Sequence, residues 1–454
     1  MNRLAHCEPL ELRRLLSGQI NFSVIFDDPA GAYAALYPAI TSNLLAAARE
    51  WGSILVPATT VDIDIKVGFP KGLPLGNGAS ATTSFVGTFG TYNMFEQGVA
   101  GEIRTGVDPN GPGAPDAILN FGDNYLRNNL WFDPDPAARV APIPNNRTDA
   151  YSVFLHELGH VFAYNGWRDG TTGQLPGNYL STWDRFIVPA DGNFFFAGPN
   201  AEQAYHGGAL VPVTYGNPNH LGNNPPRPGS DLIPQLMNGV VFTYSTRYDI
   251  SDLDVGVFRD VGLPLETVRP TVISSDFEYQ TRHALHVRFS ESVRASLELQ
   301  DVILRNLNDG STVLTSAMSL AYDRATNTAT VTFPGLPGGL LPDGNYQLTV
   351  LHTGVHDLAG NGLAADHTLN FFFKRGDANH DGLVNLSDFN ILAGNFGQSA
   401  RDFTQGDFNY DGSVNLVDFN ILASRFGTGL ASQILAVAHF QRPDSDDRGW
   451  LEIT

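Results

Sequence analysis

Apolar and polar residues alternate over residues 21–27 and 61–67, which predicts two strands that each bury one face. Between these strands, residues 39–51 carry apolar side chains at helical spacing and predict an amphipathic helix. Residues 116–120 predict a further short strand, whereas residues 76–92 are rich in Gly, Ser and Thr and show neither pattern. The N-terminal part of the chain is therefore expected to combine strands with helices.

A second helix is predicted over residues 151–166, because apolar residues again recur three and four positions apart. Asp149 is suited to cap the N-terminus of this helix, and Gly166 is suited to end it. His156 and His160 lie four positions apart within it, so on a helix both side chains project from the same face.

Three further patterns follow along the chain. Residues 165–219 are loop-like, with recurring Pro and Gly, and residues 250–262 predict a helix that Ser251 or Asp252 caps. Over residues 270–374, short alternating segments separated by turn residues predict a small antiparallel β-sandwich. No chemistry is visible in the sandwich, and we interpret it as a spacer or stalk.

Residues 376–427 contain an internal repeat, in which GDANHDGLVNLSDFNILAGNFG is followed by GDFNYDGSVNLVDFNILASRFG. Each copy has oxygen-bearing side chains at positions 1, 3, 5, 9 and 12 of a loop and Gly at position 6, which is the pattern of an EF-hand-like calcium loop. The backbone carbonyl at position 7 completes the ligands. The predicted ligands of the first calcium ion are Asp377, Asn379, Asp381, Leu383, Asn385 and Asp388. Those of the second are Asp407, Asn409, Asp411, Ser413, Asn415 and Asp418.

The composition narrows the classes of function. A net charge of −20 argues against binding to nucleic acid or to an anionic membrane surface. The length of 454 residues suggests about three domains. Cys7 is the single cysteine, which excludes an intrachain disulfide and a cysteine-based zinc site. No segment reaches the roughly 18 consecutive apolar residues that a membrane span needs.

His156, Glu157 and His160 together have the composition of a zinc site. Two neutral imidazoles one helical turn apart can bind one zinc ion, and the adjacent Glu157 can act as general base on a water. A catalytic zinc needs a third protein ligand, for which the chain offers His206 and His220.

Asp184 is a further candidate for an oxygen ligand. A carboxylate next to Arg185, or one that accepts from backbone amides, equally fits a structural role. Both interpretations of Asp184 stay open at this point.

The order of these residues resembles the leishmanolysin-like metzincin zinc metalloproteases over about residues 20–264. In that group an insertion separates the second and third histidines, and a methionine turn follows beneath the metal. The resemblance implies that His220 is the third zinc ligand and that Met237 forms an apolar floor without binding the metal. Ala163 stands where the group has a glycine, and the insertion carries no cysteine, so that His206 stays open as the third ligand.

Two further resemblances concern the C-terminal half. Residues 341–361 resemble bacterial Ig-like domains of surface proteins, and the repeat resembles a type I dockerin over about residues 375–428. Dockerins bind cohesin modules of partner proteins, often through Ser-Thr at positions that are Leu386-Ser387 and Leu416-Val417 here. The alternative is a calcium-folded cell-surface module with another kind of partner.

The N-terminus lacks the apolar core of an ordinary signal peptide. Residues 8–16, EPLELRRLL, resemble a short N-terminal motif of exported proteins from planctomycete-type bacteria, which implies export. A disordered start, or a start codon assigned too early or too late, is the alternative.

These patterns and resemblances predict a multidomain α+β chain with five parts: an export-like segment (1–18), a metzincin-like zinc protease domain (19–264), an all-β Ig-like sandwich (265–374), a small α-helical dockerin pair of calcium loops (375–428) and a tail (429–454). We expect a secreted or cell-surface zinc metalloendopeptidase that binds one Zn²⁺ and two Ca²⁺. Its expected partners are a protein or peptide substrate and a cohesin-like or cell-surface protein. The alternative is a catalytically inert adhesion or scaffold protein, although Glu157, which an inert relative would usually have lost, is present.

Overall fold

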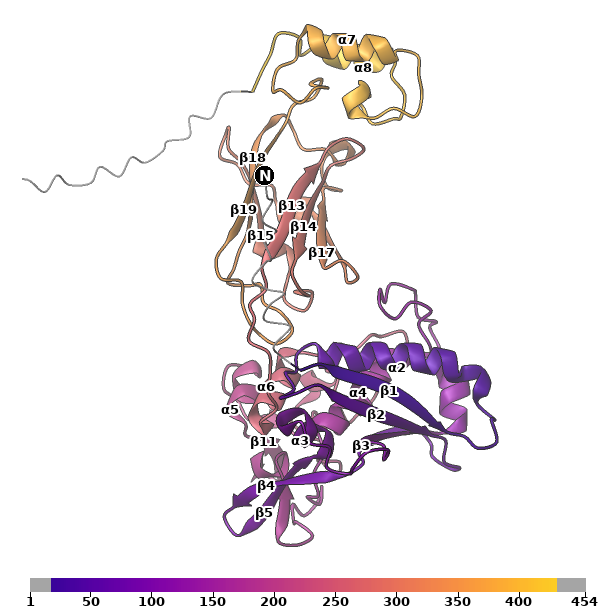
Figure 1. Cartoon of the computed structure of the whole chain (residues 1–454). Helices are drawn as coiled ribbons and strands as arrows, with labels where there is room; N and C mark the ends of the chain where they lie inside the picture. Colours follow the sequence, from indigo (N-terminus) through magenta and orange to yellow (C-terminus); the bar gives the residue numbers. More distant parts are fainter. Residues whose placement is uncertain (1–17, 431–454) are drawn as a thin grey trace, which may run out of the picture.

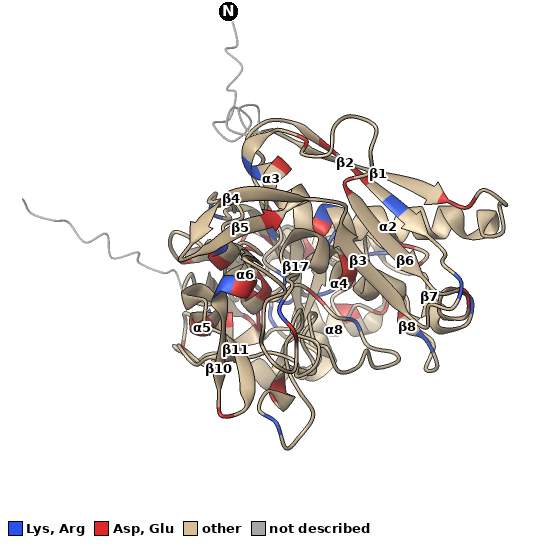
Figure 2. Cartoon of the chain, turned by 90° about the horizontal axis from the view of Figure 1, so that it is seen from below, with Lys and Arg blue, Asp and Glu red and all other residues tan. Residues whose placement is uncertain are grey.

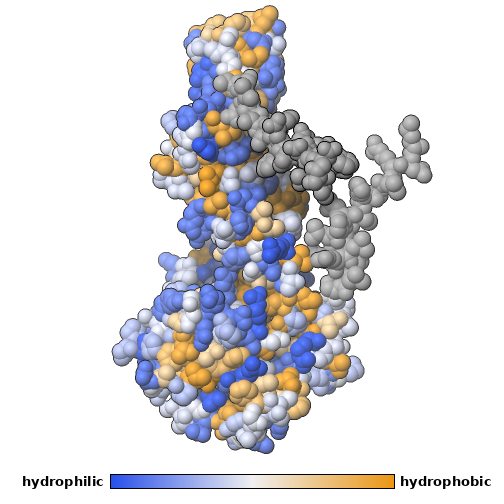
Figure 3. Space-filling view, turned by 90° about the vertical axis from the view of Figure 1, so that its left-hand side faces the viewer, coloured by the Kyte–Doolittle hydropathy of each residue, from blue (hydrophilic) through white to orange (hydrophobic). Residues whose placement is uncertain are grey.

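The computed structural model describes residues 18–430, which form three units in chain order along an elongated molecule (Figure 1). The first unit comprises residues 18–264, the second residues 265–374 and the third residues 375–430, and each has its own cluster of buried apolar side chains. The first unit is the broadest part of the molecule (Figure 3). The predicted export-like segment and the predicted tail lie almost wholly outside the described residues.

A four-stranded sheet organises the first unit, and two long helices lie against it and against each other. The strands follow one another across the sheet as β1 (Ile20–Asp27), β2 (Val61–Gly68), β6 (Ala117–Phe121) and β3 (Gly76–Ser80). The first three strands are parallel, whereas β3 runs antiparallel to β6 at the edge. The two long helices are α2 (Tyr37–Gly52) and α4 (Ala150–Phe162).

Shorter elements complete the first unit. Three small sheets are formed by β4 (Thr83–Phe89), β5 (Tyr92–Gln97) and β9 (Tyr179–Ser181); by β10 (Ile187–Ala190), β11 (Asn193–Phe196) and β12 (Val211–Pro212); and by β7 (Leu130–Trp131) and β8 (Thr148–Asp149). The remaining α-helices are α3 (Gly98–Thr105), α5 (Pro199–Ala204) and α6 (Asp252–Val261).

Trp51 joins the three larger helices of the first unit in one core. Its side chain is fully buried, its indole Nε1 donates to the carbonyl oxygen of Leu155 at 2.9 Å, and its ring stacks on Phe258 with the centroids 4.3 Å apart. A buried indole that also satisfies its N–H both removes a large apolar area from water and fixes geometry. Trp51 therefore holds α2, α4 and α6 in one arrangement.

The periodicity predicts these long elements well, but three expectations need correction. The stretch 76–92 forms strands, and residues 165–219 contain short strands and α5 in place of continuous loop. Helix α4 ends at Phe162, not at Gly166, because the amides of Ala163 and Tyr164 both donate to the carbonyl of Gly159 and close the last turn.

The second unit is a sandwich of two antiparallel sheets that enclose one apolar core. One sheet consists of β13 (Val272–Glu278), β14 (Ala284–Phe289), β17 (Thr328–Thr332) and β16 (Ser319–Asp323), in that order. The other consists of β15 (Val302–Asn306), β18 (Gly344–Val350) and β19 (His367–Phe373). In β18 the residues are buried alternately, as expected for a strand that presents one face to the core.

The third unit contains α7 (Leu386–Asn395) and α8 (Leu416–Ala423), one from each repeat copy, and rests on the end of the sandwich (Figure 1). The hydroxyl of Tyr410 donates to the carbonyl oxygen of Tyr279 at 2.7 Å, and Tyr279 stacks on His380. Phe373, the last residue of β19, belongs to the apolar core of the third unit. The sandwich and the repeat are therefore packed together rather than joined only by a linker.

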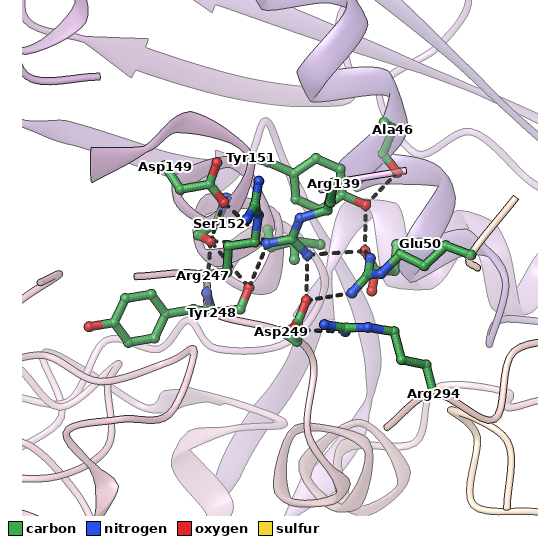
Figure 4. Close-up of polar contacts among 12 residues, drawn as sticks. Ala46, Glu50, Arg139, Asp149, Tyr151, Ser152, Arg247, Tyr248, Asp249 and Arg294 are labelled. Carbon is green, nitrogen blue, oxygen red and sulfur yellow. Dashed lines mark hydrogen bonds and ion pairs between the residues drawn. The ribbon is translucent and has the colours of Figure 1, made fainter. Parts of the chain in front are cut away.

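A partly buried network of charges joins the first unit to the second (Figure 4). The Arg139 guanidinium lies at its centre, 3.1 Å from the carboxylate of Asp149 and in contact with that of Asp249. Asp249 also pairs with two arginines of the sandwich, Arg294 at 3.0 Å and Arg324 at 2.8 Å. Since Asp149 caps α4, this network links the start of that helix to the neighbouring unit.

Among the described residues, no helix combines the length and the apolar composition that crossing a bilayer requires.

Candidate metal centre

Helix α4 brings His156 and His160 together. Every residue of this helix is buried, and its N-cap, Asp149, accepts a hydrogen bond from the amide of Ser152 at 3.2 Å. The Nε2 atoms of the two histidines are 3.2 Å apart. A buried helix with a satisfied cap is a rigid base for a pair of ligands.

His220 completes the cluster from a distant loop. Its Nε2 atom lies 3.0 Å from Nε2 of His156 and 3.0 Å from Nε2 of His160. The loop is held in place because the indole of Trp183 donates to the carbonyl of Pro218 at 2.9 Å.

The other candidate ligands lie elsewhere. His206 is exposed, and its Nε2 lies 2.9 Å from Asp231 rather than near the histidine cluster. The carboxylate of Asp184 accepts from three backbone amides, those of Trp167, Arg168 and Ser181. Asp184 thus has the structural role, and the structure brings His220 to the pair on α4 where the sequence left two histidines open.

Backbone carbonyls fix the tautomers of the two helix histidines. Nδ1 of His156 lies 2.8 Å from the carbonyl oxygen of Leu236, and Nδ1 of His160 lies 2.6 Å from that of Tyr164. A carbonyl oxygen can only accept, so both Nδ1 atoms carry the proton and both Nε2 atoms of the neutral rings present a lone pair. These lone pairs point into the space that the three histidines share.

The three histidines are arranged for a cation. Burial lowers the pKa of His156 to about 3 and that of His160 to about 4, and it also lowers that of His220, so the rings are neutral. A tetrahedral zinc ion at about 2.0–2.1 Å from each nitrogen would separate the nitrogens by about 3.3–3.4 Å. The observed 3.0–3.2 Å is close to this, whereas facing lone pairs without a cation repel. The donor set therefore fits zinc.

Glu157 lies beside the cluster, next to strand β3. Burial raises the pKa of its carboxyl to about 8, and a hydrogen bond from the Gly78 amide opposes this rise. A divalent cation nearby would favour the ionised carboxylate. A carboxyl group in such a setting is suited to exchange a proton near neutral pH.

Met237 packs against helix α4 at Gly159, the residue before His160. It is fully buried, and a Cβ atom built on Gly159 would come within 2.5 Å of its sulfur. The carbonyl of Met237 accepts from the amide of Leu221 at 2.9 Å, which ties it to the residue after His220. The methionine segment thus contacts the helix on one side and the third histidine loop on the other.

Three supporting residues were not predicted from the sequence: Gly159, Tyr164 and Leu236. Besides holding His160 through its carbonyl, Tyr164 donates its hydroxyl to Asp254, in the first turn of α6, at 2.9 Å. Gly159 had a visible signal, because glycine inside a helix costs about 1 kcal/mol and therefore marks a close approach. The two carbonyl acceptors had none, since every residue carries one.

The histidines and Glu157 line a cavity of about 910 Å³. The lining residues include the start of the edge strand β3 and residues 238–244. Basic side chains are scattered over the first unit rather than gathered at one place (Figure 2). The cavity is therefore large enough for several residues of a peptide and does not have the basic surface that a polyanion needs.

The two candidate calcium loops of the repeat have the same backbone geometry. In the first, Asp377 accepts from the amides of Asp381 and Gly382 at 3.1 and 2.7 Å. In the second, the corresponding distances from Asp407 to the amides of Asp411 and Gly412 are 3.2 and 2.8 Å.

The charges of these loops also fit a cation. The carboxylates at loop positions 1 and 12, Asp377, Asp388, Asp407 and Asp418, are buried. Burial raises the pKa of Asp377 to about 6 and also raises that of Asp407. Asn385 and Asn415, at position 9, cap α7 and α8 through their side-chain oxygens. Buried carboxylates and amide oxygens around one loop are the donor set that calcium prefers.

Comparison with known proteins identifies the second unit. Residues 262–374 match the family described as Bacterial Ig-like domain. The sandwich is an Ig-like domain. This confirms the expected resemblance to bacterial Ig-like domains. The match extends neither to the histidine cluster nor to the candidate calcium loops, and no curated protein matches the chain.

Proposed function

We propose that the first unit is a zinc-dependent endopeptidase. Its zinc ion is bound by His156, His160 and His220. The observation that carries the proposal is the convergence of three neutral Nε2 atoms within 3.0–3.2 Å, beside a buried glutamate in a peptide-sized cavity. Zinc held there would act as a Lewis acid on a peptide carbonyl and would lower the pKa of a water.

Glu157 is the proton carrier of the proposed reaction. Its carboxylate takes a proton from the attacking water and later gives it to the nitrogen of the leaving amine. Burial raises its pKa to about 8, a divalent cation nearby would favour its ionised form, and the amide of Gly78 donates a hydrogen bond to it. The carbonyls of Leu236 and Tyr164 keep the protons of the helix histidines on Nδ1, so that their Nε2 lone pairs stay available.

Strand β3 supports binding of an extended peptide. Among the described residues, β3 pairs with β6 on one side and with no strand on the other. Because an unpaired strand edge offers free amide and carbonyl groups, a substrate can add to it as a further strand. Such binding recognises the backbone of the substrate. It therefore favours peptides over esters and over amides that are not part of a peptide chain.

Replacement of Glu157 tests the proposal. We expect Glu157→Gln to retain zinc and to cleave casein about 10²–10⁴-fold more slowly than the wild type, since loss of a general base costs this much. Glu202→Gln, a matched change outside the cavity, should keep the wild-type rate. Cleavage by Glu157→Gln at the wild-type rate would reject Glu157 as the general base. No casein cleavage by the zinc-loaded wild type would reject the peptidase and favour an inert adhesion or scaffold protein.

We also propose that the third unit attaches the protein to a partner, as a cohesin-binding or other cell-surface module. Apolar residues are exposed at equivalent positions of the two copies: Leu386 is 61% exposed and Leu416 is 62%, and Phe396 and Phe426 are each 51% exposed. Hydrophobic residues are visible at this end of the molecule among hydrophilic ones (Figure 3). Exposed apolar patches of this kind mark interaction surfaces.

Export would place the proposed peptidase outside the cell. Domains of the bacterial Ig-like family occur in extracellular bacterial proteins, and residues 262–374 are such a domain. Two calcium loops fit an extracellular setting, where calcium is abundant enough to occupy weak sites.

A further inference from the structure

A cluster of three acidic side chains lies in the first unit, apart from the histidine cluster. Neither the proposed peptidase nor the proposed calcium loops of the repeat use it. Glu102 belongs to α3, Asp108 lies in the loop that follows, and Asp116 directly precedes β6. One carboxylate oxygen of each residue lies within 4.8 Å of the others. None of the three lines the cavity of the histidine centre, so the cluster is a separate feature.

Burial makes this cluster unfavourable unless a positive charge compensates it. Glu102 and Asp116 are each only 4% exposed. Burial raises the pKa of Glu102 to about 7, and the charges of Asp116, Asp108, Asp62 and Asp64 act in the same direction. The charged groups that act most strongly on Glu102 are thus all carboxylates. Buried like charges of this kind are normally neutralised by a proton or by a bound cation.

Unpartnered oxygen atoms distinguish a cation site from a hydrogen-bonded group of acids. Oε2 of Glu102 is buried and has no hydrogen-bond partner among the described residues. The same holds for Oδ1 of Asn110, in the loop between Asp108 and Asp116. Buried side-chain oxygens without a partner are rare in folded proteins, and an unseen ion is one of the ordinary explanations.

The remaining contacts hold the cluster in place. The amide of Asp64 in β2 donates to Oδ2 of Asp116 at 2.8 Å. Oδ1 of Asp108 accepts from the amides of Asn110 and Gly111, both at 2.9 Å. The carboxylates are therefore fixed by backbone amides from β2 and from the loop, while the buried oxygens of Glu102 and Asn110 stay free to bind.

We propose that Glu102, Asp108 and Asp116 bind a calcium ion, with the amide oxygen of Asn110 as a further ligand. The donor set contains only oxygen, which selects a hard cation over zinc or another transition metal. Calcium takes six to eight oxygen ligands in irregular geometry, whereas magnesium keeps several waters and is rarely enclosed by protein. The ion joins α3 and its following loop to β2 and β6.

Calcium counting tests this site in the full chain. We expect equilibrium dialysis against ⁴⁵Ca²⁺ to show one calcium ion fewer per chain for Glu102→Gln than for the wild type. Glu202→Gln, the matched control in α5, should keep the wild-type count. The comparison isolates one site whatever the repeat binds, because both variants carry the same repeat. Equal counts in the wild type and Glu102→Gln would overturn the proposal.

Thermal unfolding gives a second readout that a merely structural glutamate would not produce. Tryptophan fluorescence follows the first unit, since all tryptophans of the described residues, Trp51, Trp131, Trp167 and Trp183, lie there. In excess chelator, Glu102→Gln should melt no lower than the wild type, because one of three repelling charges is gone. Added Ca²⁺ should raise the melting temperature of the wild type and leave that of the variant unchanged. An equal calcium-induced rise in both would contradict the site. Neither readout depends on peptidase activity, and any zinc that the chelator removes is removed from the wild type and the variant alike.

Discussion

Replacing Gly159 by alanine tests the contact between the histidine helix and the methionine beneath it. The added Cβ would lie 2.5 Å from the sulfur and 3.0 Å from the terminal carbon of Met237. Ordinary contacts between such atoms are about 3.5–4.0 Å long, so the sulfur must move by about 1 Å. Met237 is fully buried, so the far end of its flexible side chain can shift only by displacing packed neighbours.

Two opposing effects set the change in the free energy of unfolding that Gly159→Ala causes. Overpacking of this kind costs about 1–3 kcal/mol, whereas Gly→Ala inside a helix gains about 1 kcal/mol. We therefore expect Gly159→Ala to lower the free energy of unfolding by about 0–2 kcal/mol. Because the carbonyl of Leu236, next to Met237, holds His156, the zinc affinity should also fall, by about 10-fold or more.

A double-mutant cycle separates this contact from general damage. Met237→Ala alone should cost about 2–5 kcal/mol, because it leaves a cavity. In Gly159→Ala/Met237→Ala the new methyl group enters that cavity, so the combined cost should be about 1–3 kcal/mol below the sum of the single costs. The assay is urea unfolding followed by tryptophan fluorescence. Single costs that add to within about 0.5 kcal/mol would refute the contact.

Three further predictions concern charges and calcium. Arg139→Ala should lower the free energy of unfolding by about 3–5 kcal/mol in urea titrations, since it leaves Asp149 buried without its partner, whereas Arg294→Ala at the surface should cost about 1 kcal/mol or less. Burial raises the pKa of Asp249, but Arg139 and Arg294 outweigh this and hold the pKa well below its usual range. The stability that Asp249 contributes is then complete above about pH 4 and is lost as the pH falls further, which thermal melts from pH 5 to pH 2 would show. Calcium removal should lower the melting temperature of the third unit in calorimetry, and Asp377→Asn should reproduce part of that loss without chelator.

Strong periodicity made α2, α4 and α6 predictable. Of the two caps that the sequence offered for α6, the structure has Ser251, which forms a capping box with Asp254. Strand β3 was missed for a physical reason. A Cβ atom on Gly78 would come within 2.4 Å of the carbonyl oxygen of Glu157, so the strand needs glycine in order to approach the helix. Glycine at that position removes the alternation by which strands are recognised.

The candidate site was predictable in part. His156 and His160 follow from a local spacing, but His220 is brought to them by contacts of a loop with β-structure and Trp183 that no local pattern encodes. His206 has the same residue type and a comparable sequence position, so only tertiary structure separates the two. The cluster of Glu102 and its neighbours was not predicted either, because its three carboxylates come from a helix, a loop and the start of a strand.

Zinc content after replacement of the third histidine tests the central claim most directly. The measurement is metal analysis of the full chain purified in parallel as wild type, His220→Ala and His206→Ala. We predict about one zinc per chain for the wild type and for His206→Ala, and a large loss for His220→Ala, because two imidazoles alone hold zinc weakly. Zinc bound equally well by His220→Ala and the wild type would contradict the account.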